Sequence, residues 1–204
     1  MITILDYGLG NVGSIRNMLK KVGVNSIITS KVEDILSANA IIIPGVGSFD
    51  QGMNNLKNLN CFDLLNQIAK SDKVPILGIC LGMQLMTKKS EEGVEDGLGW
   101  IDAEVLKFSD SHGPVPNMGW GFIKDLKTSN IYRNIGREYK FYFVHSFFVN
   151  CFDKNDILSE TNYGDDFVSS FQKKKILGVQ FHPEKSHQFG INFFKNWLDH
   201  YSIS

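Results

Sequence analysis

Two unbroken apolar runs constrain the fold of this chain more than any other feature. Residues 40–44 read Ala-Ile-Ile-Ile-Pro, and residues 75–79 read Pro-Ile-Leu-Gly-Ile. A continuous apolar run of this kind is typical of a strand that is buried on both faces. Strands buried on both faces occur in parallel sheets between layers of helices, so the two runs indicate an α/β fold.

The order of elements in the first half of the chain supports this interpretation. Strand patterns occur at 2–6, 24–29, 40–44 and 75–79, and helical patterns at 14–22, 61–69 and 81–89. Alternating strands and helices predict a largely parallel central sheet flanked by helices. Short aromatic runs at 101–108, 139–148, 167–172 and 176–181 predict additional mixed or antiparallel strands, before a closing helix at 188–201. Because there is no repeat or linker, we expect one domain over residues 1–204.

Composition excludes several classes of function. The 204 residues carry a formal net charge of -1, which indicates neither nucleic acid nor an anionic membrane as a partner. No segment approaches the roughly 20 apolar residues that span a bilayer. The cysteines, Cys61, Cys80 and Cys151, are far apart and odd in number. This count argues against a disulfide framework or a zinc site, and we expect a reducing cytoplasm.

A glycine pattern near the N-terminus resembles a dinucleotide-binding fingerprint. Residues 8–13 match G-x-G-x-x-G between an expected strand and an expected helix. The fingerprint also needs an acidic residue about 20 positions on. Glu33 and Asp34 come slightly late, although Lys31 suits a phosphate-bearing cofactor. A tight strand-to-helix turn is the preferred interpretation, because a dinucleotide site explains nothing in the rest of the chain.

Cys80 lies between two glycines where a buried strand is expected to become a helix. The segment Gly78-Ile79-Cys80-Leu81-Gly82 has the spacing of a nucleophile elbow, with cysteine in place of serine. Glycines are needed there because side chains on either flank of so sharp a turn would clash. The amides of the following helix would favour the thiolate, and the Leu81 N–H is placed to bind an oxyanion. We therefore expect Cys80 to be a nucleophile, although buried cysteines without chemistry are common.

A cysteine nucleophile requires a base, and the base requires an orienting acid. His182 follows an apolar strand pattern, and Glu184 lies two residues further on, within reach of its imidazole. His112 lies in a polar segment that is typical of a surface loop, and His200 lies near the end of the closing helix. His182 and Glu184 are therefore the expected base and orienting acid.

Glycines also flank Val46, in the segment Pro44-Gly45-Val46-Gly47 after the third expected strand. They leave the peptide of Val46 free to rotate, so that it can direct an N–H at an oxyanion opposite Leu81. A plain strand-to-loop turn explains the same glycines, and only Cys80 favours the first interpretation.

Three motifs then occur in the order that one family has them. These are P-G-V-G at 44–47, G-I-C-L-G-M-Q at 78–84 and V-Q-F-H-P-E-K-S at 179–186. Together they resemble the class I glutamine amidotransferases along the whole chain. D-Y-G-L-G-N-V at 6–12, M-G-W at 118–120, Y-F-V-H-S at 142–146 and H-P-E-K-S at 182–186 are most similar to the glutaminase subunits of imidazole glycerol phosphate synthase.

The resemblance implies a role for each matched residue. Cys80 attacks the glutamine side-chain amide, His182 shuttles protons and Glu184 orients His182. The Val46 peptide and the Leu81 N–H form the oxyanion hole. The implied substrate-binding residues are Gly45, Gly47, Gln84, Glu92, His145, Ser146 and Phe147. The implied partner-docking residues are Asn11, Tyr142 and Lys185. Neither a cofactor nor a metal is implied.

The resemblance also implies a reaction and a partner. L-glutamine would be hydrolysed to glutamate and ammonia through a cysteine thioester. The ammonia would pass, shielded from water, into a (β/α)₈-barrel synthase (cyclase) subunit that forms a heterodimer with this chain and serves histidine biosynthesis. Shielding matters because protonated ammonia is no longer a nucleophile.

One departure from the family pattern leaves the ammonia acceptor open. The family segment usually reads P-H-M-G-W-N, whereas this chain has Asn117 and Gly121 at the second and last positions. An alternative is therefore a paralogous glutaminase that supplies ammonia for an amidine on a bacterial surface sugar. A non-catalytic binding protein and a cysteine peptidase on a related fold are the remaining alternatives. The expected triad argues against the first, and Gln84 and Glu92 against the second.

Overall fold

The computed structural model describes residues 1–109, 113–133 and 139–203, so His112 lies outside the described residues. Within them, ten strands form one mixed sheet in the order β2-β1-β3-β4-β12-β11-β10-β7, and β9 joins β5 to β11. Two further strands, β6 and β8, pair antiparallel. This arrangement confirms the predicted α/β fold.

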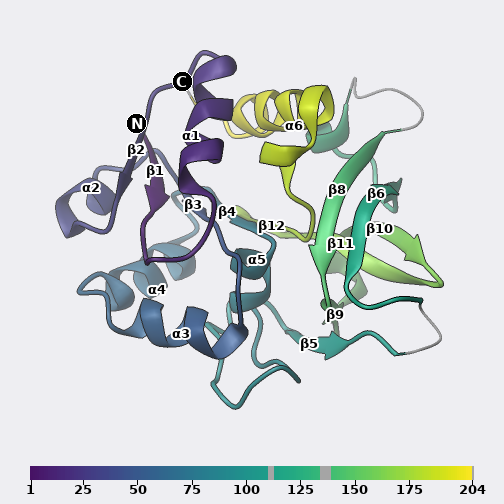
Figure 1. The fold of residues 1–204 in the computed structure, drawn as a ribbon. Helices are drawn as coiled ribbons and strands as arrows, with labels where there is room; N and C mark the ends of the chain where they lie inside the picture. Colours follow the sequence, from purple (N-terminus) through teal and green to yellow (C-terminus); the bar gives the residue numbers. More distant parts are fainter. Residues whose placement is uncertain (110–112, 134–138, 204) are drawn as a thin grey trace.

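The parallel half of the sheet contains the strands predicted from the apolar runs. Its strands are β1 (Ile2–Leu5), β2 (Ser26–Thr29), β3 (Ala40–Ile43), β4 (Ile76–Ile79) and β12 (Ile176–Val179). Every residue of β3 and β4 is buried, because helices cover both faces of the sheet (Figure 1). Although β12 comes late in the sequence, it lies beside β4 with Val179 opposite Ile79.

Alternate residues of each central strand belong to two different hydrophobic layers. Ala40 and Ile42 pack with α1 (Val12–Lys21) and α6 (His187–His200) on one face. Ile41 and Ile43 pack with the helices of the other face. Those helices are α2 (Val32–Leu36), α3 (Phe49–Lys57), α4 (Phe62–Ser71) and α5 (Leu81–Leu85). The period of two along each strand therefore divides the core into two layers.

The second half of the chain contributes antiparallel strands, most of which extend the main sheet, while β6 and β8 form their own pair (Figure 1). They are β5 (Ala103–Lys107), β6 (Asn117–Phe122), β7 (Lys124–Asp125), β8 (Lys140–His145), β9 (Phe147–Cys151), β10 (Ile157–Tyr163) and β11 (Asp165–Lys173). Among the described residues, the short 3-10 helix η2 (Asn130–Tyr132) lies between β7 and β8, and η3 (Lys154–Asp156) lies between β9 and β10. A further 3-10 helix, η4 (Pro183–Lys185), lies between β12 and α6.

Several predicted boundaries were wrong. The helix expected at 81–89 is α5, which ends at Leu85. The run at 139–148 is divided at Ser146 into β8 and β9, which pair with different strands. Two helices, α2 and α3, and three strands, β6, β7 and β10, carried no pattern strong enough to be predicted. No helix in the described ranges is long and apolar enough to cross a membrane.

Candidate active site

Cys80 occupies the turn between β4 and α5 in an unusual backbone conformation, with φ 52° and ψ −111°. The glycines on both sides are required by close packing. A Cβ on Gly78 would lie 2.7 Å from Cε of Met86, and a Cβ on Gly82 would overlap the carbonyl of Ile43. The turn expected from the two glycines is therefore formed, and it places Cys80 at the carboxyl end of a central parallel strand, where α/β proteins bind ligands.

His182 follows β12, the strand beside β4, and its side chain is paired with Glu184. Nδ1–H of His182 donates to Oε1 of Glu184 over 2.8 Å, and both side chains are 1% exposed. The backbone N–H of His182 donates to the Tyr142 carbonyl at 2.8 Å, and Oγ of Ser186 donates to the His182 carbonyl at 2.7 Å. Pairing with Glu184 and these backbone contacts fix the tautomer and direction of the imidazole.

The protonation of His182 is controlled by its two acidic neighbours. Burial alone would lower its pKa, but the negative charges of Cys80 and Glu184, together with hydrogen bonding to them, raise the pKa to about 10. Within the described part of the chain, the buried Nε2 atom of His182 makes no hydrogen bond. His182 follows β12 and Cys80 follows the neighbouring β4, so Nε2 can take the thiol proton and return it later.

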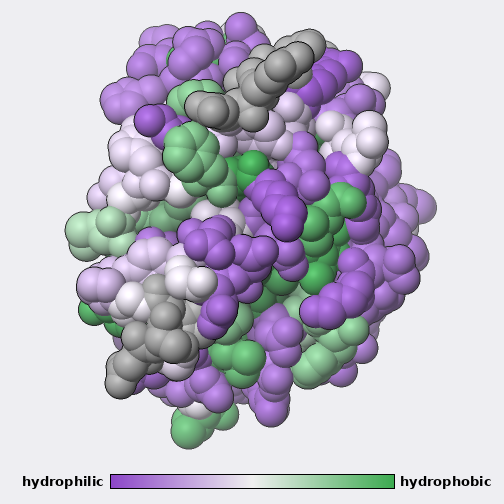
Figure 2. Space-filling model, turned by 90° about the vertical axis from the view of Figure 1, so that its right-hand side faces the viewer, coloured by the Kyte–Doolittle hydropathy of each residue, from purple (hydrophilic) through white to green (hydrophobic). Residues whose placement is uncertain are grey.

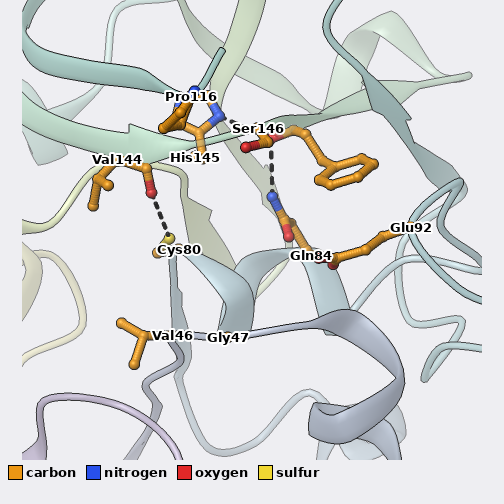
Figure 3. Close-up of a pocket in the computed structure, with 10 residues that line it drawn as sticks. Val46, Gly47, Cys80, Gln84, Glu92, Pro116, Val144, His145 and Ser146 are labelled. Carbon is orange, nitrogen blue, oxygen red and sulfur yellow. Dashed lines mark hydrogen bonds between the residues drawn. The ribbon is translucent and has the colours of Figure 1, made fainter.

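A pocket of about 270 Å³ opens above the sulfur. Its lining residues are Val46, Gly47, Cys80, Gln84, Glu92, Pro116, Val144, His145, Ser146 and Phe147. Figure 3 shows Val46 and Gly47 on one side of Cys80, with Val144 and His145 on the other. Most of the expected substrate-binding residues are thus brought together around the expected nucleophile, from five separate segments of the chain.

Gln84 and Glu92 contribute polar groups to this pocket, and each is held by a second contact. Nε2 of Gln84 donates to the Phe147 carbonyl at 3.0 Å. Oε2 of Glu92 accepts the N–H of Phe49, at the start of α3, at 2.8 Å. A fixed carboxylate beside a fixed amide suits a ligand with an ammonium group at one end and an amide at the other.

His145 lines the pocket as a neutral imidazole. Burial, together with the nearby charge of His182, lowers its pKa to about 4, although a hydrogen bond to the Phe147 carbonyl acts in the opposite direction. Nδ1–H donates to that carbonyl at 2.8 Å, and Nε2 accepts Nδ2–H of Asn117 at 3.2 Å. Asn117, a departure from the family pattern, therefore completes the hydrogen bonding of His145.

The segment expected to form the oxyanion hole lies against the start of α5. Leu81 is the first residue of α5, so its N–H has no helical carbonyl to bind. A Cβ on Gly45 would lie 2.6 Å from Cβ of Leu81, which places Gly45 behind the pocket wall and outside its lining. Gly47 has φ +115°, a conformation that side chains disfavour. The Tyr7 hydroxyl donates to the Pro44 carbonyl at 2.5 Å and anchors the segment at its beginning.

The expected docking residues lie near an exposed apolar face of the β6–β8 pair. Nζ of Lys185 lies 5.8 Å from the ring centre of Tyr142, and Asn11 precedes α1, which packs against η4. Exposed apolar side chains follow β6: Met118 at 63%, Trp120 at 41% and Phe122 at 58%. Figure 2, viewed from the side of these strands, shows hydrophobic side chains at the surface among hydrophilic ones.

The sequence analysis missed one buried polar residue that contacts the sulfur. Gln180 is fully buried, and its Nε2 lies 3.6 Å from Sγ of Cys80. The available signal was a glutamine directly after an apolar strand, next to the H-P-E segment. Among the described residues, no group of three or more His, Cys, Asp or Glu side chains could hold a metal ion.

Comparisons with known proteins agree with this geometry. The model of the family "Glutamine amidotransferase class-I" matches residues 3–200. Imidazole glycerol phosphate synthase subunit HisH 2 of Methanococcus maripaludis is 50% identical over 97% of this chain and 98% of its own. The protein of the same name from Pseudomonas aeruginosa is 42% identical over 98% and 99%.

A solved structure has the same fold. A crystal structure described as a glutamine amidotransferase superposes with a TM-score of 0.78 at 17% identity and covers 98% of both chains. The family model matches nearly the whole chain, and the two relatives are 50% and 42% identical to it over nearly their full lengths. The chain therefore belongs to the class I glutamine amidotransferases.

Proposed function

We propose that this chain is the glutaminase subunit of imidazole glycerol phosphate synthase. The observation that carries the proposal is the position of Cys80, on a strained turn beside the buried His182–Glu184 pair and at the base of a pocket with fixed amide and carboxylate groups. The names of the relatives, at 50% and 42% identity over nearly complete chains, support the assignment to this synthase. We further propose that residues 1–204 form one domain that works in the cytoplasm, a reducing compartment in which Cys61, Cys80 and Cys151 stay free.

In the first half of the reaction, His182 takes the Cys80 proton and Sγ attacks the side-chain carbonyl carbon of glutamine. The carbonyl oxygen becomes an oxyanion, which the Leu81 N–H and the Val46 peptide stabilise. When the C–N bond breaks, His182 returns the proton to the leaving nitrogen, and ammonia departs from a thioester on Cys80. Glu184 stabilises the imidazolium without taking up its proton.

In the second half, a water molecule attacks the thioester carbonyl while His182 removes one of its protons. The C–S bond then breaks, glutamate leaves, and Cys80 recovers its proton. The substrate's ammonium group lies against Glu92, and its amide end faces Cys80. Gln84 and the 145–147 segment line the space between these two ends.

The partner is a cyclase subunit, a (β/α)₈ barrel that receives the ammonia. It docks on the face that carries Asn11, Tyr142 and Lys185, next to the apolar side chains of β6. Apolar side chains exposed on one strand, with Lys140 and Lys185 beside aromatic rings, are typical of a protein interface.

The two departures from the family pattern do not favour a different acceptor. Asn117 and Gly121 both face inward: Asn117 binds His145, and a Cβ on Gly121 would lie 2.9 Å from ring atoms of Phe143. The outward-facing Met118 and Trp120 keep the family pattern. Surface-sugar amidation therefore stays an outcome of the test below and is not a second proposal.

The test measures glutamate and ammonia formation by the purified chain, alone and with its co-expressed cyclase subunit and that subunit's ligand. We expect Cys80→Ala to abolish release, and His182→Ala to reduce it by about 100- to 10,000-fold, because base and acid are both lost. Cys61→Ala and Cys151→Ala serve as controls with normal turnover. Ammonia release by Cys80→Ala would refute the mechanism, and stimulation only by a sugar-modifying partner would refute the histidine pathway.

A further inference from the structure

The helix that follows Cys80 is shorter than the sequence predicted, so it contributes less to stabilising the thiolate. An α-helix stabilises a thiolate at its N-terminus through aligned peptide dipoles. However, α5 contains only the five residues Leu81–Leu85. Cys80 is also 6% exposed, so water provides little solvation for a negative sulfur. The imidazolium of His182 supplies one stabilising charge, and a hydrogen-bond donor on another side of the sulfur would add to it.

We propose that Gln180 is a further catalytic residue, whose side-chain N–H donates to Sγ of Cys80 and whose orientation is set by Gln84. The inference rests on the proposed role of Cys80 as nucleophile. Nε2 of Gln180 lies 3.6 Å from Sγ, within hydrogen-bond range for sulfur. The backbone N–H of Gln180 donates to the Ser169 carbonyl at 2.9 Å, which ties the residue to β11. Gln180 is fully buried, so its amide has no alternative partner in bulk water.

The direction of the Gln180 amide follows from the groups around it. A carbonyl oxygen accepts only, so the Phe147 carbonyl requires Gln84 to present its NH₂ group. The same Nε2 of Gln84 also lies 3.0 Å from Oε1 of Gln180. One hydrogen goes to each acceptor. Gln180 must therefore direct its oxygen at Gln84 and its NH₂ at the sulfur, so that a donor and not an acceptor faces Cys80.

The sulfur thus has two contacts of opposite character. The thiol can donate to the Val144 carbonyl, which is 4.0 Å away, whereas the thiolate accepts from Gln180 at 3.6 Å. The shorter contact is the one that favours the thiolate. The same contact stabilises the sulfur as it leaves the thioester, so Gln180 contributes to both halves of the reaction.

Other titratable groups around Cys80 act independently of Gln180. They are His182 and Glu184 from the segment after β12, Tyr7 after β1, and His145 at the end of β8. None of their side chains bonds to the Gln180 side chain. A change confined to Gln180 therefore leaves these groups in place, and the ionisation of Cys80 isolates its effect.

The experiment measures the alkylation rate of Cys80 by iodoacetamide against pH, with the modified peptide identified by mass spectrometry. Gln180→Leu and Gln180→Met remove the donor and keep most of the volume. We expect both to raise the apparent pKa of Cys80 by about one pH unit, the usual effect of one hydrogen bond to an ionised group. At pH 7, kcat/KM for ammonia release should fall about tenfold. Gln172→Leu is the control: this residue of β11 lies opposite Leu177 within β12, whereas Gln180 follows the end of β12, and the change should shift neither quantity.

A double-mutant cycle tests the role of Gln84. We expect Gln84→Met to raise the apparent pKa of Cys80 by less than Gln180→Met, and to add nothing in the Gln180→Met background, because it acts on the sulfur through Gln180. Additive shifts would refute this relay. Folded Gln180 variants that alkylate with the wild-type pH profile would refute the proposal itself. Alkylation requires no glutamine, so this result is separate from ammonia release by Cys80→Ala, which alone would refute the glutaminase function.

Discussion

At the scale of single residues, Cys80 combines two requirements that oppose each other. Its φ of 52° and ψ of −111° direct the sulfur towards the pocket at the end of β4, yet residues other than glycine rarely adopt such angles. A residue held in a disfavoured region costs on the order of 1–3 kcal/mol. The close packing of Gly78 and Gly82 against neighbouring elements keeps the turn in place.

The free-energy cost of this backbone conformation predicts that a substitution of Cys80 can stabilise the fold while it abolishes activity. In urea denaturation, Cys80→Gly should have a free energy of unfolding about 1 kcal/mol higher than that of Cys80→Ala. Glycine relieves the backbone strain and loses only part of that gain to its greater entropy in the unfolded state. Both variants should lack glutaminase activity. Equal stability of the two variants would mean that the backbone at Cys80 is unstrained.

The raised pKa of His182 gives a second prediction at this scale. Its folded value of about 10 exceeds the ordinary 6.5, so the stability gained from its protonation is fully present below pH 6.5 and is lost as pH rises through about 10. We expect an NMR titration to show a lower pKa for His182 in Cys80→Ala and in Glu184→Gln, since each removes a negative neighbour. His200 is the internal control and should titrate identically in all three proteins. An unchanged His182 would contradict the charge coupling.

At the scale of elements, the turn that contains Val46 is anchored at its beginning and unrestrained further on. The Tyr7 hydroxyl holds the Pro44 carbonyl, and Gly45 packs tightly against α5. By contrast, Val46 is 41% exposed, and Gly47 relies on a positive φ. Rotation of the second oxyanion donor would therefore be confined to the peptide between Val46 and Gly47.

That freedom predicts a glutaminase that is slow alone and fast in its complex. An absent oxyanion donor costs roughly 100- to 1,000-fold in rate. We expect Gly47→Ala to reduce partner-stimulated ammonia release more than basal release, because alanine disfavours φ +115° although an added Cβ would make only an ordinary contact, 3.9 Å from Cδ2 of Leu9. Gly23→Ala, also at a positive φ but far from the site, controls for strain. A single chain that turns over as fast as the complex would exclude this regulation.

The elements also show what the sequence could and could not predict. The strands β3 and β4 were predictable because both of their faces are apolar. In contrast, β10 was not, because its Ser159 is buried through hydroxyl contacts to Ser169 and Ser170 on another strand. The same limit applied at the site. The local motifs around Cys80 and His182 indicated the chemistry, but the contact of Gln180 spans 100 residues and depends on β12 lying beside β4.

At the scale of the whole molecule, the active-site pocket and the apolar face of β6 share one strand pair. His145 ends β8 inside the pocket, and Tyr142 of the same strand lies opposite Trp120. The Trp120 ring also stacks on His187, with 5.7 Å between ring centres. A partner bound to this face would contact the strand that lines the pocket, which connects docking with catalysis.

We therefore expect Trp120→Ala to weaken cyclase binding at least tenfold, about 1.4 kcal/mol, because aromatic residues dominate the binding energy of interfaces. Basal ammonia release should change little. Leu36→Ala, which removes another exposed apolar side chain on α2, is the matched control. Binding can be measured by calorimetry with the purified cyclase subunit. Unchanged affinity in Trp120→Ala would place the interface elsewhere.

The late position of β12 in the sequence has a consequence for synthesis. A ribosome delivers residues 1–175 before this strand, and until then β4 and β11 lack the neighbour that joins the two halves of the sheet. The nascent chain exposes β4 as an unpaired edge, which favours capture by chaperones or association with other chains. It also holds Cys80 without His182, so a truncated translation product consumes no glutamine.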